Sequence, residues 1–160
     1  MARQTTTNAI GLDKAKSEKL ISSLNDLLAA YQVIYMNTRG FHWNVKGPQF
    51  FELHLKFEEL YNAHLLKVDE VAERILTLGG VPIHTFSDAV KLSGVKESRG
   101  ISDGQKAVKI SLEGLSWLIS HQRDLQKMAQ DAGDEGTAAL MGDYIREQEK
   151  LVWMYSAYLN

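Results

Sequence analysis

The sequence has 160 residues, of which 44% are hydrophobic and 24% are charged, and its formal net charge is −2. These values are ordinary for a soluble globular protein of one domain, and they give no general electrostatic reason to bind nucleic acid. Cysteine is absent, which excludes disulfides and thiolate ligands, so any bound metal must use nitrogen and oxygen donors. No apolar run could span a membrane, and the N-terminus lacks a signal-peptide core. We therefore expect a cytoplasmic protein without a membrane partner.

The N-terminal part of the chain is predicted to be a short tail followed by a long helix. Residues 1–12 are polar and aperiodic, so we expect a flexible tail ahead of a single domain of residues 13–160. From Asp13, a plausible N-cap, apolar residues recur at steps of three and four as far as Phe41. That is the period of a helix, and His42 closes its apolar stripe.

A second long helix is predicted after the Lys46-Gly47-Pro48 turn, because proline is favoured in the first turn of a helix. Its apolar stripe ends before Gly79-Gly80, where glycine can close a helix. Residues 81–101 are a long connection, in which residues 85–92 are predicted to form a short helix.

Two further helices are predicted in the last part of the chain. The Ser102-x-x-Gln105 pattern indicates a capping box for the first of them, which Gly133 ends, and Asp134 is a suitable cap for the second. No segment has the period of a strand. Four amphipathic helices with one long crossover between the second and third predict an all-α, ferritin-like four-helix bundle, with a short extra helix in the crossover.

Five side chains in the first half of the chain could bind a metal: His42, His54, Glu58, Asp69 and Glu73. On the second predicted helix, His54 and Glu58 share one face at a spacing of four residues, and Asp69 and Glu73 do the same. The two pairs are 15 residues apart. That separation is roughly 22 Å along a helix, which one metal ion cannot bridge.

The spacing of these pairs is symmetric. Positions 54 and 73, and likewise 58 and 69, are centred on one point beside His64. If the helix packs antiparallel against its own copy about a two-fold axis there, His54 of one chain lies opposite Asp69 and Glu73 of the other. We therefore expect the metal site between chains, twice per dimer.

The pattern alone leaves a structural alternative open. A single histidine on an apolar stripe is more often a core or interface residue, and a single helical glutamate is usually solvated. Imidazole with carboxylate suits iron, manganese or zinc, so the ligand types do not select the metal. The Glu-x-x-His pairs of di-metal sites in bundles are absent. The pattern therefore predicts a sparse, partly open site.

Four segments carry a family resemblance: His42-Trp43-Asn44-Val45-Lys46-Gly47, Phe50-Phe51-x-Leu53-His54, Asp69-Glu70-Val71-Ala72-Glu73-Arg74 and Leu78-Gly79-Gly80-x-Pro82. Through them, and through residues 134–137 and 149–154, essentially the whole chain resembles the Dps family, the miniferritins known as DNA-binding proteins from starved cells. The resemblance implies a hollow homo-dodecamer that binds Fe(II) at subunit interfaces, oxidises it with hydrogen peroxide in preference to oxygen, and stores ferric mineral.

The resemblance also implies which residues form the di-iron ferroxidase site. Its ligands fall on His42 and His54 of one subunit and on Asp69 and Glu73 of the two-fold mate, in agreement with the antiparallel pairing inferred from spacing. Glu58 stands where the family commonly has aspartate. The carboxylate is kept with one more methylene, so we retain Glu58 as a ligand whose coordination is shifted or indirect.

Several neighbouring residues have two interpretations. In the family, a tryptophan at the position of Trp43 absorbs stray oxidising equivalents; the alternative is an interface aromatic. His64 is expected to pack near the two-fold axis rather than to bind metal. Asp131, Asp134 and Glu135 are ordinarily a solvated helix start, and the resemblance implies that they lie near acidic pores.

Three functions remain open from the sequence: an iron-oxidising storage protein, a DNA-compacting structural protein of the same fold, and a cage without ferroxidase activity. Retention of all five candidate ligands argues against the last. The tail before Asp13 carries only Arg3 as a basic side chain. Because DNA affinity rises with the number of phosphates neutralised, we expect DNA binding to be weak or absent.

Overall fold

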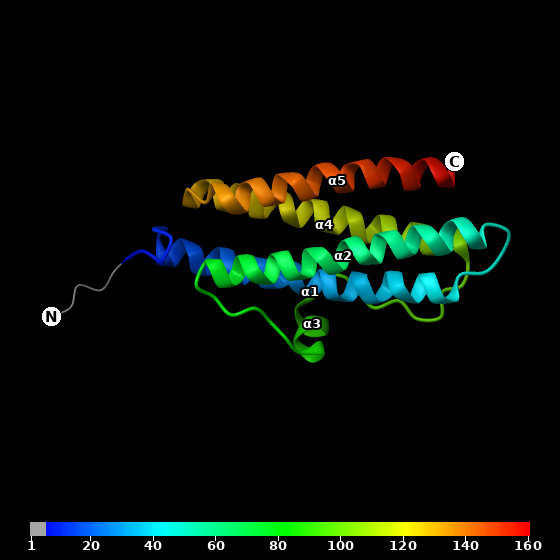
Figure 1. Ribbon diagram of the computed structural model, residues 1–160, viewed down its shortest axis with the longest axis horizontal. Helices are drawn as coiled ribbons and strands as arrows, with labels where there is room; N and C mark the ends of the chain where they lie inside the picture. Colours follow the sequence, from blue (N-terminus) through cyan, green and yellow to red (C-terminus); the bar gives the residue numbers. More distant parts are fainter. Residues whose placement is uncertain (1–5) are drawn as a thin grey trace.

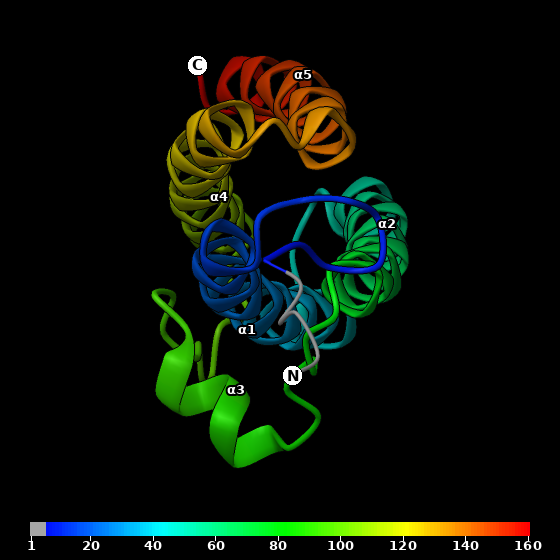
Figure 2. The same ribbon diagram turned by 90° about the vertical axis from the view of Figure 1, so that its left-hand side faces the viewer.

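The computed structural model describes residues 6–160, which form an elongated bundle of four long helices with one short helix outside it (Figure 1). The helices are α1 (Lys14–Asn44), α2 (Phe50–Thr77), α3 (Phe86–Leu92), α4 (Gly104–Ala132) and α5 (Glu135–Leu159). Seen end-on, α1 lies between α2 and α4, and α3 lies on the side of α1 away from α5 (Figure 2). The described residues contain no strand, only two isolated bridges. The predicted all-α bundle and its short crossover helix are confirmed.

Aspartates cap the N-termini of three long helices. The side chains of Asp13, Asp103 and Asp134 accept hydrogen bonds from backbone N–H groups three residues later, and so satisfy donors that a helix start leaves free. The predicted capping box at Ser102 is wrong, because Asp103 is the cap and the Ser102 carbonyl accepts from the Lys46 N–H at 2.9 Å. Gly133 ends α4 with a φ of 73°, a conformation that favours glycine.

The predicted tail of residues 1–12 is described only in part, since residues 1–5 lie outside the described residues. Within the rest, Asn8 organises a turn: its side-chain oxygen accepts from the Leu12 N–H at 2.9 Å. The Asn8 amide nitrogen donates to the Leu78 carbonyl at 3.2 Å, which joins this turn to the end of α2.

The bundle interior holds two apolar clusters, one toward each end. The first includes Leu20, Leu24, Leu27, Val71, Ile75 and Leu125, and the second includes Phe41, Val45, Leu53, Phe57, Leu60 and Leu115. Burying one such large side chain contributes ~1.5–3 kcal/mol, so these clusters supply the main driving force for helix packing. The second cluster lies beneath the loop that joins α1 to α2, and therefore fixes that end of both helices.

Polar side chains lie near the middle of the bundle. Tyr31 Oη accepts hydrogen bonds from Gln122 Nε2 and Gln148 Nε2, both at 2.7 Å. The His64 ring lies 5.8 Å from the Tyr31 ring, and neither of its nitrogens has a hydrogen-bond partner in the described part of the chain. Burial, with a smaller contribution from Lys67, lowers the pKa of His64 from 6.5 to about 3. His64 is therefore a neutral core residue near neutral pH.

No helix between residues 6 and 160 combines the length and the apolar character that crossing a membrane requires.

Candidate metal centre

The two histidines predicted as ligands face each other across the loop between α1 and α2. His42 lies in the last turn of α1, and His54 lies in the second turn of α2. Each follows a fully buried aromatic or aliphatic residue, Phe41 and Leu53 respectively. Successive helical positions point about 100° apart, so each imidazole lies next to its buried neighbour, at the edge of the core.

The two histidines exchange hydrogen bonds through their backbones. His42 Nδ1 lies 2.7 Å from the carbonyl oxygen of His54, and His54 Nδ1 lies 2.8 Å from the carbonyl oxygen of His42. A carbonyl oxygen can only accept, so each Nδ1 carries a proton, and in the neutral imidazole each Nε2 then keeps its lone pair. The His42 carbonyl is among the last four of α1, which lack partners within the helix, so the bond from His54 also completes the helix end. The exchange fixes the tautomer that a metal ion needs.

Aromatic rings hold this pair on both sides. The two imidazoles are stacked, with centroids 3.8 Å apart and an interplanar angle of 15°. Phe50 stacks on His54 at 5.0 Å, and Tyr61 meets His42 edge-on at 5.4 Å. His42 is 9% exposed and His54 is half-buried. The rings are therefore fixed in orientation before any metal binds, which lowers the entropy lost on binding.

The three predicted carboxylates do not join the histidines equally. Glu58 is half-buried and lies one turn after His54 on α2. Asp69 and Glu73 are exposed and lie farther along the same helix, roughly 22 Å from the His54 turn by helix geometry. Among residues 6–160, no three His, Cys, Asp or Glu side chains come close enough to hold one metal ion. Within one chain the five predicted ligands therefore fall into two separate groups, His42, His54 and Glu58 in one and Asp69 and Glu73 in the other.

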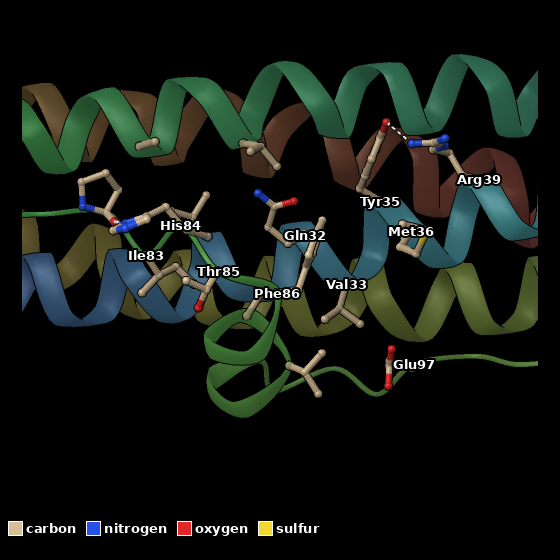
Figure 3. Close-up of a pocket in the computed structure, with 16 residues that line it drawn as sticks. Gln32, Val33, Tyr35, Met36, Arg39, Ile83, His84, Thr85, Phe86 and Glu97 are labelled. Carbon is tan, nitrogen blue, oxygen red and sulfur yellow. Dashed lines mark hydrogen bonds between the residues drawn. The ribbon is translucent and has the colours of Figure 1, made fainter.

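An apolar groove runs along the second half of α1, between α1, α2 and α3 (Figure 3). Its volume is about 850 Å³. Met36, Phe86 and Val90 line it and are largely exposed, and Arg39 and Tyr35 lie at one end, joined by a hydrogen bond of 2.8 Å. An exposed apolar surface of this kind is typical of a region that another molecule covers.

The structure also places residues that the sequence left with two interpretations. Trp43 is 59% exposed, and the Arg39 guanidinium lies 4.6 Å from its ring centre. Asp134, expected on a solvated helix start, is only 2% exposed, so that expectation is wrong for this residue. It binds Arg74 Nη2 at 2.5 Å, because a buried carboxylate needs a compensating charge.

Sequence reasoning missed the aromatic residues around the histidines. Tyr35 lies seven residues before His42, and Tyr61 lies seven residues after His54. A spacing of seven places each tyrosine two turns away on the same helix face as its histidine. That spacing was a usable signal, but the contact of Tyr61 with His42 crosses from α2 to α1 and depends on the packing of the two helices.

Comparison with known proteins identifies the family of this chain. The family model described as a ferritin-like domain matches residues 21–160. The DNA protection during starvation protein of Porphyromonas gingivalis is 43% identical over 148 residues, covering 92% of this chain and 93% of that protein. General stress protein 20U of Bacillus subtilis is 36% identical and is covered to 99% of its length by 90% of this chain.

Among solved structures, the Dps protein of Vibrio cholerae O1 is 54% identical, with a TM-score of 0.97, and the alignment covers 99% of this chain and 100% of that one. That protein is described as a member of a broad superfamily of ferritin-like diiron-carboxylate proteins. With these matches, the chain belongs to the ferritin-like family and, within it, to the Dps miniferritins.

Proposed function

We propose that this chain binds Fe(II) between two copies of itself, oxidises it and stores the ferric product inside a hollow dodecamer. Fe(II) is the substrate, and hydrogen peroxide is its preferred oxidant over oxygen. His42, His54 and Glu58 of one copy and Asp69 and Glu73 of the other are the proposed ligands of a two-iron site. The proposal also places the protein in the cytoplasm, where it limits oxidative damage.

The observation that carries the proposal is the exchange of hydrogen bonds between His42 and His54. Two imidazoles with protonated Nδ1 atoms offer two Nε2 lone pairs from one rigid, partly open surface. Metal-binding histidines in proteins typically donate their second nitrogen to a carbonyl or carboxylate in this way. The core histidine His64, by contrast, has no hydrogen-bond partner for either ring nitrogen within the described residues.

The exposure of Asp69 and Glu73 supports a metal site between two copies of the chain. Asp69 and Glu73 face outward, and within the described chain neither carboxylate has a hydrogen-bond or ion-pair partner. Large apolar side chains are also exposed on α2, notably Phe51 and Leu66 at 81% and 69%. Water-exposed apolar surface on the same helix favours packing against a second copy. Antiparallel packing would complete two sites at once, since a two-fold interface is reciprocal.

The ligand types suit oxidation of the bound iron. Neutral imidazole nitrogens bind Fe(II), and carboxylate oxygens stabilise the harder, more highly charged Fe(III), so the site favours the oxidised product. Two Fe(II) ions together deliver the two electrons that convert one hydrogen peroxide into two hydroxide ions. Because both electrons are available at one site, the O–O bond breaks without release of hydroxyl radical.

A complementation experiment tests whether the site is shared. His54→Ala and Asp69→Ala chains are each assembled alone and then co-assembled in equal amounts, and Fe(II) oxidation by peroxide is followed by absorbance. Each variant alone should be inactive. In random co-assemblies about one quarter of the sites should regain an intact His54 and an intact Asp69, because each site takes them from different copies.

Inactive co-assemblies would contradict the shared site, provided that light scattering shows particles of unchanged mass. As a matched control, His54→Ala co-assembled with Glu58→Ala should regain nothing beyond its parents, since our proposal takes both residues from the same copy.

DNA compaction is the second candidate, because relatives carry the name DNA protection during starvation protein. The basic side chains near the N-terminus give it little support. Arg3 is the only one before Asp13, and Lys16 Nζ donates to the Asp131 carbonyl at 2.7 Å. A gel shift at roughly 0.15 M salt should therefore show weak or no retardation, because few phosphates can be neutralised. Tight retardation at that salt concentration would favour the DNA-compacting function.

A further inference from the structure

Each of the four long helices contributes one polar side chain to a cluster in the middle of the bundle. This central polar cluster consists of Tyr31 of α1, His64 of α2, Gln122 of α4 and Gln148 of α5. Each of these residues is at most 2% exposed. The long helices surround the cluster, and apolar side chains pack toward both ends of the bundle (Figure 2). Bulk water therefore does not reach these polar atoms.

The hydrogen bonds inside the cluster leave four polar atoms without a protein partner. Tyr31 Oη accepts from Nε2 of Gln122 and from Nε2 of Gln148, both at 2.7 Å. The Oε1 atoms of both glutamines and both ring nitrogens of His64 have no partner among residues 6–160. In a neutral imidazole one nitrogen donates and the other accepts. The four atoms are therefore three acceptors and one donor.

Turning the amide groups does not remove this deficit. An amide can be rotated so that its oxygen and nitrogen exchange places, and a histidine proton can move between the two ring nitrogens. The Tyr31 hydroxyl, however, has a single proton to donate. If it donates to the oxygen of one glutamine, the nitrogen of that amide loses its partner instead. A buried polar atom without a partner costs about 1–3 kcal/mol, so a further hydrogen-bonding molecule at this position would stabilise the fold.

The charges near the cluster favour a neutral molecule over a cation. The nearby carboxylates of Glu70 and Glu147 already accept hydrogen bonds from Tyr144 and Lys67. Burial, with a smaller contribution from Lys67, lowers the pKa of His64 to about 3, so its ring is neutral near neutral pH. The tyrosine and the glutamines of the cluster are also uncharged. A metal ion here would lose its hydration without gaining a free counter-charge.

We propose that the central polar cluster binds ordered water, with at least one molecule that bridges His64 to the oxygens of Gln122 and Gln148. A water molecule offers two protons and two lone pairs. It can donate to both glutamine oxygens and accept from the imidazole N–H, which satisfies three of the four atoms at once. Ordering one water costs at most about 2 kcal/mol, less than the penalty for three unsatisfied groups. Buried waters that join otherwise unsatisfied groups are part of a protein's structure.

A bridging water at this position would connect α2 to α4 and α5. His64 lies in the middle of α2, between the turn of His54 and the turn of Asp69. The water would therefore act as a structural ligand that holds the centre of this helix in place.

A crystal structure of the assembled, metal-free protein tests the site directly. Density for a water should lie about 2.7–3.2 Å from a His64 nitrogen and from a glutamine oxygen. Crystals soaked in Mn(II) should show no anomalous signal at the cluster. An anomalous peak there would identify a cation site and overturn the proposal of water. Absence of density, in maps that show other buried waters, would also overturn it.

Magnetic relaxation dispersion of the water oxygen nucleus provides a test in solution, because it counts waters that remain bound while the particle tumbles. The triple variant Tyr31→Phe/Gln122→Met/Gln148→Met replaces three hydrogen-bonding partners with apolar side chains of similar size. It should lose the amplitude of at least one long-lived water per chain. Gln126→Met is the matched control on α4, since the Gln126 amide donates to the Ala138 carbonyl outside the cluster. This control should keep the wild-type amplitude.

His64→Leu offers a second route if the triple variant does not assemble. It removes both imidazole nitrogens and should also lower the amplitude relative to the wild type. Wild-type amplitude in an assembled triple variant or in assembled His64→Leu would overturn the proposal. An equal loss in Gln126→Met would do the same, because the water lost would then not belong to the cluster.

Discussion

The histidine pair and His64 show how differently one helix can use the same side chain. At the pair, His42 and His54 each donate Nδ1–H to a main-chain carbonyl and keep an Nε2 lone pair at a partly exposed surface. Ten residues after His54, His64 is 2% exposed, and neither ring nitrogen has a partner in the described chain. The two uses thus differ in where the ring nitrogens lie, with the Nε2 atoms of the pair at a partly exposed surface and both nitrogens of His64 inside the core.

The largest expected effect is on metal binding, which should depend on the histidine pair and not on His64. Loss of a residue that supports a metal ligand typically costs ~10–100-fold in metal affinity or activity. His54→Ala removes a proposed ligand itself, so it should reduce Fe(II) affinity and peroxide-dependent oxidation by at least that factor. His64→Leu, the matched control on the same helix, should leave both nearly unchanged. Titration calorimetry with Zn(II) as a redox-inert surrogate measures the affinity. Loss of Zn(II) binding in His64→Leu with an intact particle would break the distinction.

The next effect is on the pH dependence of the free energy of unfolding, which should depend on His64. The pKa of folded His64 is lowered from 6.5 to about 3, so the unfolded chain binds a proton first as the pH falls. The stability contributed by neutral His64 is therefore complete above about pH 6.5 and is lost toward about pH 3, by up to about 5 kcal/mol. Lys67 and the carboxylates of Glu70 and Glu147 are the charged groups that lie near this core.

His64→Leu should remove that part of the acid destabilisation. Thermal unfolding of both proteins is compared at fixed concentration from neutral pH to about pH 4, so that other titrating groups cancel. The difference between the variant and the wild type should grow as the pH falls. Parallel curves would show that His64 is not the group responsible.

A smaller effect is expected from Tyr31, which anchors the polar core. Tyr31→Phe removes the acceptor of the hydrogen bonds from Gln122 and Gln148, both fully buried amides. Leaving buried donors unsatisfied costs about 1–3 kcal/mol each, so the variant should unfold several degrees earlier. Its Fe(II) oxidation rate should match that of the wild type. Reduced Fe(II) oxidation by a variant that still assembles normally would show that the polar core influences the proposed metal site.

The smallest expected effect concerns Glu58, which lies between the two regions. Glu58→Gln should lower the second Fe(II) stoichiometry and the two-iron oxidation rate more than it weakens the first metal, because an amide is a poorer ligand for a hard cation. Glu58→Asp should be mild, since it keeps a carboxylate. Unchanged stoichiometry and rate in Glu58→Gln would remove this residue from the proposed site.

Much of the fold could be predicted from the sequence, because the information is local. The apolar steps of three and four indicated all four long helices, and turn chemistry at Lys46-Gly47-Pro48 and at Gly133 indicated two of the boundaries. The cap of α4 could not be chosen between neighbouring polar residues. Asp103 is the cap, since the Ser102 carbonyl is engaged by the loop after α1, a contact made by residues far apart in sequence.

The residue types of the candidate site could be predicted from the sequence, but the relative positions of its side chains could not. Helical spacing predicted that His54 shares a helix face with Glu58 and that Asp69 shares one with Glu73. The exchange of hydrogen bonds between His42 and His54 depends on the axial register of α1 against α2, which the loop and the packed core set together. The burial of Asp134 was missed for the same reason, because Arg74 reaches it from another helix.

The two anchors of the histidine pair are main-chain oxygens, and this determines which changes the pair tolerates. Substituting one histidine leaves the other's hydrogen-bond partner in place, because the carbonyl remains whatever the side chain. No point substitution can delete these acceptors. The length of the segment 45–49 matters more, because this loop joins the end of α1 to the start of α2 and so helps to set where each ring meets the other residue's carbonyl. The geometry of the histidine pair thus depends on the number of residues in the loop as much as on the identity of the side chains beside it.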